Sequence, residues 1–388
     1  MRIAGAWLSH PGTQDVCRML TAAGFRALFV GGCVRDALIG RPVGDIDIAT
    51  DARPEDVVRL AGAAGLRAVP TGIDHGTVTV IAEGRPHEIT TFRRDIETDG
   101  RHATVAFSTD VAEDAARRDF TMNALYATPD GEIVDPLGGL ADLEARRLRF
   151  VGAAEARIEE DYLRILRFFR FHAWYGDPAE GPDPDALAAI AVATEGLDGL
   201  SRERVGQEIR KLLSAPDPSQ AVALMRQTGV LSQILPGAED RALAPLIHLE
   251  QAPEIMCPPD PMRRLAVLGP EAPGPALRLS KDDLRGYDLM RDGMASSMSA
   301  AELGYRFGRD RAESILLLRW AIFEMLPQPE DIMQAGLGAR AKFPVTARDL
   351  MPGYSGPALG ARLAELEHRW IASGFALTRE QLCADGDG

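Results

Sequence analysis

The chain has 388 residues and a mass of 41.9 kDa, which is enough for two or three domains. Hydrophobic residues at 46% and charged residues at 26% are ordinary globular values that exclude a disordered or collagen-like chain, and no apolar run approaches the roughly 18 residues of a membrane span. The net charge of −14 argues against a nucleic-acid partner held by bulk attraction, although residues 201–388 are close to neutral, with 22 basic and 25 acidic groups.

Short β-branched runs separated by turns fill the first third of the chain and alternate with helical patterns. We expect strands at residues 27–30, 45–50, 77–82, 87–92 and 132–134. We expect helices at residues 34–40, 54–64 and 113–125. Strands and helices alternating within one hundred residues predict an α/β or α+β domain around a small sheet.

After Pro136 the apolar spacing changes to three and four residues, and no strand pattern remains. We expect helices at residues 154–174, 202–214, 218–230, 299–325 and 358–372. Clusters of proline and glycine mark joints between them at residues 176–184, 252–274 and 352–357. The remainder of the chain is therefore predicted to be all-α.

A glycine turn follows the first predicted strand directly. Gly31 and Gly32 come between residues 27–30 and the helical pattern that contains Arg35. Glycine lets the backbone approach a ligand closely, and a helix start offers free N–H groups to an anion, so a phosphate is the expected guest. A purely structural turn is the alternative, because the GxGxxG pattern is not met.

Two aspartates alternate on the next predicted strand. Asp45 and Asp47 would project from the same face, with isoleucines on the other. Two adjacent like charges are favourable when a divalent cation lies between them, and hard oxygen ligands shared with phosphates suit Mg²⁺. A solvated edge strand is the alternative. Glu88, on the strand at 87–92, is a candidate third carboxylate that the sequence leaves open.

The segment RRDFTMNAL places two guanidinium groups and an amide on the predicted helix 113–125. Arginine is a good clamp for triphosphate oxygens, which suggests Arg118, and Asn123 could hold a sugar hydroxyl. A salt-bridged helix surface would show the same residues.

The predicted helix 154–174 carries a row of charged residues opposite its apolar face. At 100° per residue, Asp161 and Arg164 are neighbours, whereas Arg170 lies half a turn away. A carboxylate only accepts hydrogen bonds and a guanidinium only donates them, so this pair would match cytosine and adenine and reject uracil and guanine. Arg167 and Arg170 would then hold phosphates or brace the pair. An ion pair of Glu160 with Arg164 on a solvated helix is the alternative.

Together these segments resemble a known family. LFVGGCVRDALIGRPVGDIDIAT, HGTVTV, RRDFTMNALYATPDGEIVDPLGG, EEDYLRILRFFRF and LSRERVGQEIRKLL are similar to the successive motifs of the tRNA nucleotidyltransferase and poly(A) polymerase family in its bacterial form (class II). The resemblance covers just under half of the chain. It implies an α+β fold, with a polymerase-β-like nucleotidyltransferase head containing a small mixed sheet, followed by an all-α neck, body and tail. The implied domains are a head at residues 1–148, a base-recognising neck at 149–213 and a tRNA-binding body and tail at 214–388.

The activity implied by the resemblance is template-independent addition of CCA to tRNA 3′ ends from CTP and ATP, with release of pyrophosphate. Asp45 and Asp47 would be the catalytic residues that hold Mg²⁺. The nucleotide would be bound by Gly32, Arg35, Arg118, Asn123, Asp161, Arg164, Arg167 and Arg170.

A poly(A) polymerase and a partial CC- or A-adding enzyme are the alternatives within the family. Residues 93–110 are expected to form a full-length polar loop, which in this family favours addition of the final A. A catalytically silent RNA-binding protein would not need the paired aspartates. An antibiotic-modifying nucleotidyltransferase would not need Asp161 with Arg164 or a large helical half.

The four cysteines form no CxxC motif or close pair, and the start lacks the apolar core of a signal peptide. We therefore expect a reduced, cytoplasmic protein with no membrane contact and no obligate protein partner.

Overall fold

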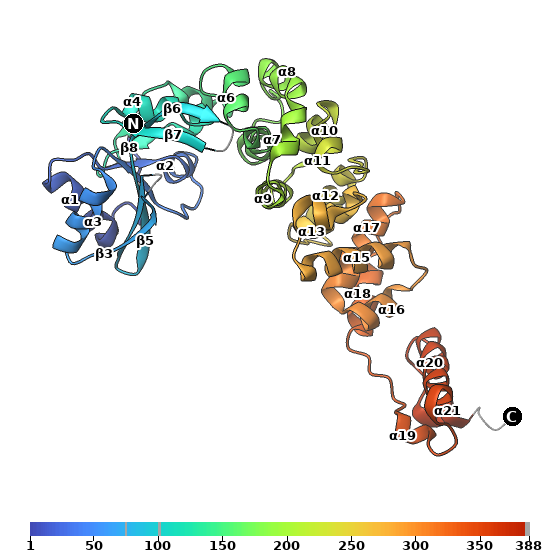
Figure 1. Cartoon of the computed structure of the whole chain (residues 1–388). Coiled ribbons are helices and arrows are strands. Elements are labelled where there is room, and N and C mark those ends of the chain that lie inside the picture. Colours follow the sequence, from blue (N-terminus) through green and yellow to red (C-terminus); the bar gives the residue numbers. More distant parts are fainter. Residues whose placement is uncertain (74–75, 100–101, 385–388) are drawn as a thin grey trace. The chain divides into compact units, whose positions relative to one another are not determined.

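The computed structural model describes residues 1–73, 76–99 and 102–384, and the chain divides into two compact units, residues 1–234 and 235–388 (Figure 1). The first unit contains every strand of the described chain, and the second contains helices. The expected α+β class, with a small mixed sheet followed by helices, is confirmed.

A seven-stranded mixed sheet forms the centre of the first unit. Its strands run in the order β3-β4-β5-β2-β1-β8-β9, and all neighbours are antiparallel except β2 and β5. The strand bounds are β1 Leu28–Val30, β2 Asp47–Thr50, β3 Arg67–Gly72, β4 Thr77–Ala82, β5 Arg85–Thr91, β8 Tyr126–Ala127 and β9 Ile133–Val134. Burial alternates along β4, as the sequence TVTVIA predicts for a strand with one covered face. The expected strand 45–50 begins two residues late, because Asp45 lies in a bend before β2.

A separate hairpin replaces part of the loop expected at residues 93–110. β6 (Arg93–Asp99) pairs antiparallel with β7 (His102–Phe107), so the expectation of a loop is wrong for these residues. Residues 100–101 of that stretch lie outside the described residues. Polar residues dominate β6, with the sequence RRDIETD, so it lacks the apolar alternation that identifies a half-buried strand. In β7, with the sequence HATVAF, the first four residues do alternate between polar and apolar, and this was the available strand signal.

Helices cover the sheet and continue the first unit. The helices α1 and α3 lie side by side against β3–β5 (Figure 1). The helix bounds are α1 Pro11–Ala22, α2 Gly32–Leu38, α3 Pro54–Ala63, α4 Val111–Ala116, α5 Gly139–Glu144, α6 Ala154–Glu160, α7 Leu163–Tyr175, α8 Pro184–Val192, α9 Arg202–Leu213, α10 Ser219–Gln227 and α11 Val230–Ile234, with 3₁₀ turns at Thr121–Asn123 and Thr194–Gly199.

Two of the expected helices are interrupted. The helix expected at 113–125 ends at Ala116, and Phe120 pairs instead as an extended residue with Phe150. The helix expected at 154–174 is broken at Asp161, whose backbone is extended between α6 and α7. At the first break, backbone hydrogen bonds from Thr121 to Arg149 and from Val151 to Asp119 replace helical ones. At the second break, the Asp161 side chain bonds to Leu163 and Arg204. A helical period in the sequence reveals neither contact.

The second unit is a stack of helices. Their bounds are α12 Leu243–Gln251, α13 Pro261–Leu268, α14 Pro273–Leu277, α15 Lys281–Ala295, α16 Ala300–Phe307, α17 Arg309–Ile322, α18 Pro329–Gly338, α19 Ala347–Leu350, α20 Gly356–Ala372 and α21 Arg379–Ala384. Gly308 divides the helix expected at 299–325 into α16 and α17, because its positive φ of 80° ends the first helix.

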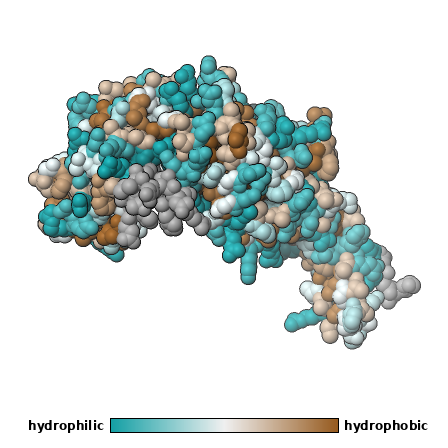
Figure 2. All heavy atoms as spheres, turned by 45° about the horizontal axis from the view of Figure 1, so that its top comes forward, coloured by the Kyte–Doolittle hydropathy of each residue, from teal (hydrophilic) through white to brown (hydrophobic). Residues whose placement is uncertain are grey.

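The surface, the helix lengths and the state of the cysteines all agree with what the composition predicts. On the face shown in Figure 2, hydrophilic residues predominate and hydrophobic ones lie in small groups. No described helix is long and apolar enough to cross a membrane. All four cysteines are free, as expected.

Candidate active site

Two elements of the sheet bring three carboxylates near one another. Asp47 begins β2 and lies in register with Glu88 on the parallel strand β5, while Asp45 is exposed just before it. Burial, the charge of Glu88 and the charge of Asp45 together raise the pKa of Asp47 to about 6, and only Arg118 opposes them. Among the described residues, nothing donates a hydrogen bond to the Asp47 carboxylate, so this is a site with surplus negative charge.

The surplus negative charge favours a bound cation, but few side chains are placed to act as metal ligands. No three side chains of His, Cys, Asp or Glu converge to hold a metal ion within the described part of the chain. Glu88 is therefore beside Asp47 without completing a three-carboxylate cluster. The oxygen pair Asp45 and Asp47 fits a divalent ion that takes its remaining ligands from water or phosphate.

The glycine turn lies next to this site. Gly31 has φ 69° and ψ −120°, a conformation that favours glycine, and Gly32 begins α2. The Cys33 thiol donates to the backbone oxygens of Val30 and Asp47 at 3.4 and 3.7 Å, so it joins the turn to β2. Burial raises the pKa of Cys33 to about 11, which leaves its thiol protonated and makes it a structural group.

Arg118 faces both the turn and the aspartates. Its Nη1 lies 3.5 Å from the position that a Cβ on Gly31 would occupy. Its Nη2 donates to Asp114 at 3.0 Å and its Nε to the Tyr126 hydroxyl at 3.1 Å. Two of the three nitrogens thus hold the guanidinium in place, and the third is directed to the turn, as a triphosphate clamp would require.

Arg35 and Asn123, two expected nucleotide ligands, are bound by protein groups. Arg35 is buried and donates to Asn123 Oδ1 at 2.6 Å and to the Tyr175 hydroxyl at 2.7 Å, and its guanidinium lies 4.0 Å from the Tyr175 ring centroid. Asn123 in turn donates to Asp119 Oδ1 at 2.9 Å. These two side chains therefore connect α2 to α7 behind the glycine turn.

Two buried acids, Asp119 and Glu208, bind the next two arginines of α7. Asp119 Oδ2 accepts from Nε of Arg167 at 2.8 Å and also from its Nη2. Glu208 on α9 accepts from Nε of Arg170 and lies 4.0 Å from Arg167 Nη1. Both acids are buried, and a buried carboxylate is strongly destabilising unless a cation pairs with it. Arg167 and Arg170 accordingly brace α7 against the head and α9.

The expected reading pair has different partners in the structure. Asp161 Oδ2 accepts from Arg204 Nη2 at 2.6 Å, and Arg164 Nη1 donates to Glu160 and to the Arg157 carbonyl oxygen. The pairing of Glu160 with Arg164, considered as an alternative from sequence, is thus present. Each side chain of the expected pair therefore has its own partner, Arg204 for Asp161 and Glu160 for Arg164.

Sequence reasoning missed the acidic residues that organise the site. Asp114, Asp119 and Glu208 are buried, each against an arginine that the sequence did single out. All three lie within or beside the segments that resemble the family motifs. An acidic residue at a buried position of the helical pattern was the available signal, since such residues are rarely buried without a partner.

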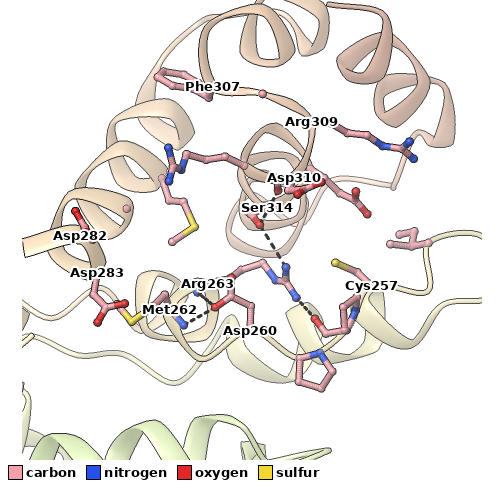
Figure 3. Close-up of a pocket in the computed structure, with 18 of the residues that line it drawn as sticks. Cys257, Asp260, Met262, Arg263, Asp282, Asp283, Phe307, Arg309, Asp310 and Ser314 are labelled. Carbon is pink, nitrogen blue, oxygen red and sulfur yellow. Dashed lines mark hydrogen bonds between the residues drawn. The ribbon is translucent and has the colours of Figure 1, made fainter. Parts of the chain in front are cut away.

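A pocket of about 1090 Å³ lies in the second unit, away from these residues in sequence (Figure 3). Its walls come from the segment before α13, from α13 and α15, and from the junction of α16 with α17. Arg263 in its wall donates to Ser314 and to the Pro258 carbonyl oxygen. Acidic side chains outnumber arginines along it, with Asp260, Asp282, Asp283, Asp310 and Glu313 against Arg263, Arg309 and Arg311. This hollow does not have the cationic lining that an RNA phosphate needs.

Comparison with known proteins first defines the class. Residues 27–149 match a family model described as the poly A polymerase head domain, and residues 182–241 match one described as the probable RNA and SrmB-binding site of polymerase A. These two segments of the chain are thus of the polymerase A type.

Longer matches define the family. The CCA tRNA nucleotidyltransferase 1, mitochondrial, of Mus musculus is 32% identical over 405 residues that cover 96% of this chain and 88% of the relative. The CCA-adding enzyme of Geobacillus thermodenitrificans is 42% identical over 58% of this chain and 54% of its own length. The crystal structure of the Bacillus stearothermophilus CCA-adding enzyme in complex with CTP superposes with a TM-score of 0.75 at 30% identity, covering 94% of this chain and 93% of that one. The chain belongs to the CCA-adding tRNA nucleotidyltransferases, which confirms the resemblance found in the sequence.

Proposed function

We propose that this protein adds C, C and A to the 3′ ends of tRNA, using CTP and ATP and releasing pyrophosphate. Family membership supports the reaction, and one arrangement carries the proposal: Asp45 and Asp47 stand at the edge of β2 beside a glycine turn that Arg118 faces. A carboxylate pair next to a phosphate-binding turn is what nucleotidyl transfer requires.

We propose that Asp45 and Asp47 hold Mg²⁺. The raised pKa of Asp47 and the missing hydrogen-bond donors at its carboxylate support a cation there. Bound at that place, the ion would lower the pKa of the tRNA 3′-hydroxyl and offset charge on the phosphate oxygens.

The chain's own side chains would bind and orient the triphosphate. Backbone N–H groups at Gly32 and the third nitrogen of Arg118 would hold its oxygens. Arg35 and Asn123 would act behind the turn, where their bonds to Tyr175 and Asp119 keep α2 in register with α7. No covalent intermediate is required, and no activated thiol lies at the site.

Base selection would rest on Asp161 and Arg164. A backbone hydrogen bond of 2.9 Å from the Arg164 N–H to the Asp161 carbonyl oxygen keeps the two residues on one turn. The Arg164 guanidinium would exchange Glu160 for the acceptor atom of cytosine or adenine, while Asp161 accepts from the exocyclic amino group. Arg167 and Arg170 would brace the pair.

The domain division implied by the family is kept as part of the proposal. Residues 1–148 would form the catalytic head, 149–213 the neck that reads the base, and 214–388 the body and tail that bind tRNA by shape and phosphates.

The decisive experiment uses purified protein, Mg²⁺ and a tRNA that lacks its 3′ end. CTP, ATP, UTP and GTP are supplied singly and together, and the products are sequenced. We expect two C and one A, after which extension stops. Polymerisation of ATP alone on arbitrary RNA would instead identify a poly(A) polymerase, and C addition without A would identify a partial enzyme.

A further inference from the structure

Asp161 lies outside the helices that flank it. Its backbone is extended, with φ −157° and ψ 104°, between the end of α6 and the start of α7. Its Oδ1 accepts a hydrogen bond of 3.1 Å from the N–H of Leu163, the first residue of α7. The second carboxylate oxygen, Oδ2, is bonded to a residue from another helix.

Arg204 supplies that second contact. Its Nη2 donates to Asp161 Oδ2 at 2.6 Å from α9, 43 residues along the chain. The start of α9 is itself held, because the Ser201 hydroxyl accepts from the Arg204 N–H at 3.4 Å. Glu208, one turn further on the same helix face, receives Arg170. One face of α9 thus contacts the α6–α7 segment twice, through Arg204 with Asp161 and through Glu208 with Arg170.

Arg164 does not orient Asp161 in this arrangement. Its guanidinium donates to Glu160 and to the carbonyl oxygens of Arg157 and Arg117. Arg204 therefore makes the charge-assisted contact to Asp161, whereas Arg164 pairs with Glu160.

We propose that Arg204 is a positioning residue for Asp161 and thereby a determinant of selectivity for C and A over U and G; the inference rests on the proposed function. Donors on both oxygens fix the plane of the carboxylate before a nucleotide arrives, so its remaining lone pairs keep one direction. A fixed acceptor then faces the O4 of uracil or the O6 of guanine without a proton between them, and such unpaired polar groups permit strong rejection. A carboxylate that turns freely would move aside and lose this discrimination.

The test compares Arg204→Met with Arg204→Lys and with Arg202→Met. Arg202 lies on the same helix two residues away, and no hydrogen bond or ion pair of its side chain is found among the described residues, so it is the matched control. Single-turnover incorporation is measured with CTP and with UTP on a tRNA lacking its 3′ end, and with ATP and with GTP on a tRNA ending in CC. For Arg204→Met we expect the CTP-to-UTP and ATP-to-GTP ratios of kcat/KM to fall about tenfold or more, since a hydrogen bond to a charged group is lost. Arg204→Lys should restore part of the ratio, and Arg202→Met should match the wild type.

Unchanged ratios in a folded Arg204→Met protein would overturn the inference and leave Arg204 a structural brace only. If circular dichroism shows that Arg204→Met is unfolded, Arg204→Lys decides: a lowered ratio supports positioning, and a wild-type ratio overturns it. A wild-type protein that adds no C or A at all would refute the proposed function itself, so the two failures are distinguishable.

Discussion

At the scale of single residues, the proposed catalytic groups are the carboxylates of Asp45 and Asp47 at the start of β2. Asp45 is exposed and Asp47 is half-buried, so the pair reaches solvent while one member is shielded by the sheet. This combination raises the pKa of Asp47 and leaves Asp45 free to move to a ligand.

Replacing Asp45 by alanine tests the metal assignment at little structural cost, because the side chain is exposed. We expect Asp45→Ala to lower nucleotide incorporation by roughly 10³-fold or more, since one of the two proposed metal ligands is removed. tRNA affinity, measured by filter binding, should remain. Asp56→Ala on the surface of α3 is the control and should keep wild-type activity; substantial activity in Asp45→Ala would remove the metal assignment.

A buried histidine makes folding depend on pH. His87 on β5 is fully buried, its Nε2 is 2.9 Å from the Thr13 hydroxyl, and burial lowers its pKa. The unfolded chain takes up a proton near pH 6.5 whereas the folded chain keeps this imidazole neutral, so the free energy of unfolding falls as the pH drops below about 6.5.

The contribution of His87 is measured as a difference. We expect urea unfolding of the wild type to lose up to about 1.4 kcal/mol per pH unit more than His87→Gln between pH 6.5 and 5.5. His172, whose pKa burial also lowers, is present in both proteins and cancels. Parallel pH profiles of the two proteins would show that His87 does not contribute.

At the scale of elements, close helix packing in the second unit depends on two glycines. A Cβ on Gly304 of α16 would lie 1.9 Å from the Ala335 carbonyl oxygen, and one on Gly338 of α18 would lie 1.9 Å from that of Ala301. These contacts bring the two helix backbones together, so neither position has room for a side chain.

Gly304→Ala should therefore destabilise the protein by about 2 kcal/mol or more, because α16 and α18 must separate. Gly336→Ala on α18 is the matched control, since a Cβ there meets no atom within 4 Å. It should be neutral or stabilising by up to about 1 kcal/mol. Urea unfolding compares the two, and equal stabilities would contradict the packing argument.

The break between α6 and α7 determines which partners Asp161 and Arg164 have. A continuous helix would place Asp161 and Arg164 side by side, but the extended residue at the break gives each its own partner. Side chains hold α7 on both sides, through Arg167 with Asp119 and through Arg170 with Glu208 on α9.

At the scale of the whole molecule, the net charge of −14 opposes a polyanionic substrate at long range. Binding of tRNA must then rest on a few local phosphate contacts. We expect the slope of log affinity against log salt to lie near −2 to −4, which corresponds to a handful of neutralised phosphates. Filter binding between about 50 and 200 mM salt measures it. A slope steeper than about −6 would indicate a broad cationic surface instead.

The sequence by itself determined the class of fold and the family, and it provided the candidate groups of the proposed site. Asp45, Asp47 and the glycine turn are contiguous with strands whose apolar alternation is local, so their placement at one sheet edge follows from short-range pattern. The helical character of the second half follows in the same way from spacing of three and four residues.

Only the tertiary structure decided which of the charged groups are paired with one another. From the sequence, four polar side chains were expected to bind the nucleotide: Arg35, Asn123, Arg167 and Arg170. In the structure they bond to other protein side chains, among them Tyr175, Asp119 and Glu208, at sequence separations of up to 140 residues. The strands β6 and β7 are paired by cross-strand bonds, and Asp161 at the break is bonded to Arg204, 43 residues along the chain. Local patterns report which face of an element is apolar, whereas ion pairing depends on distances that exist only once the chain has folded.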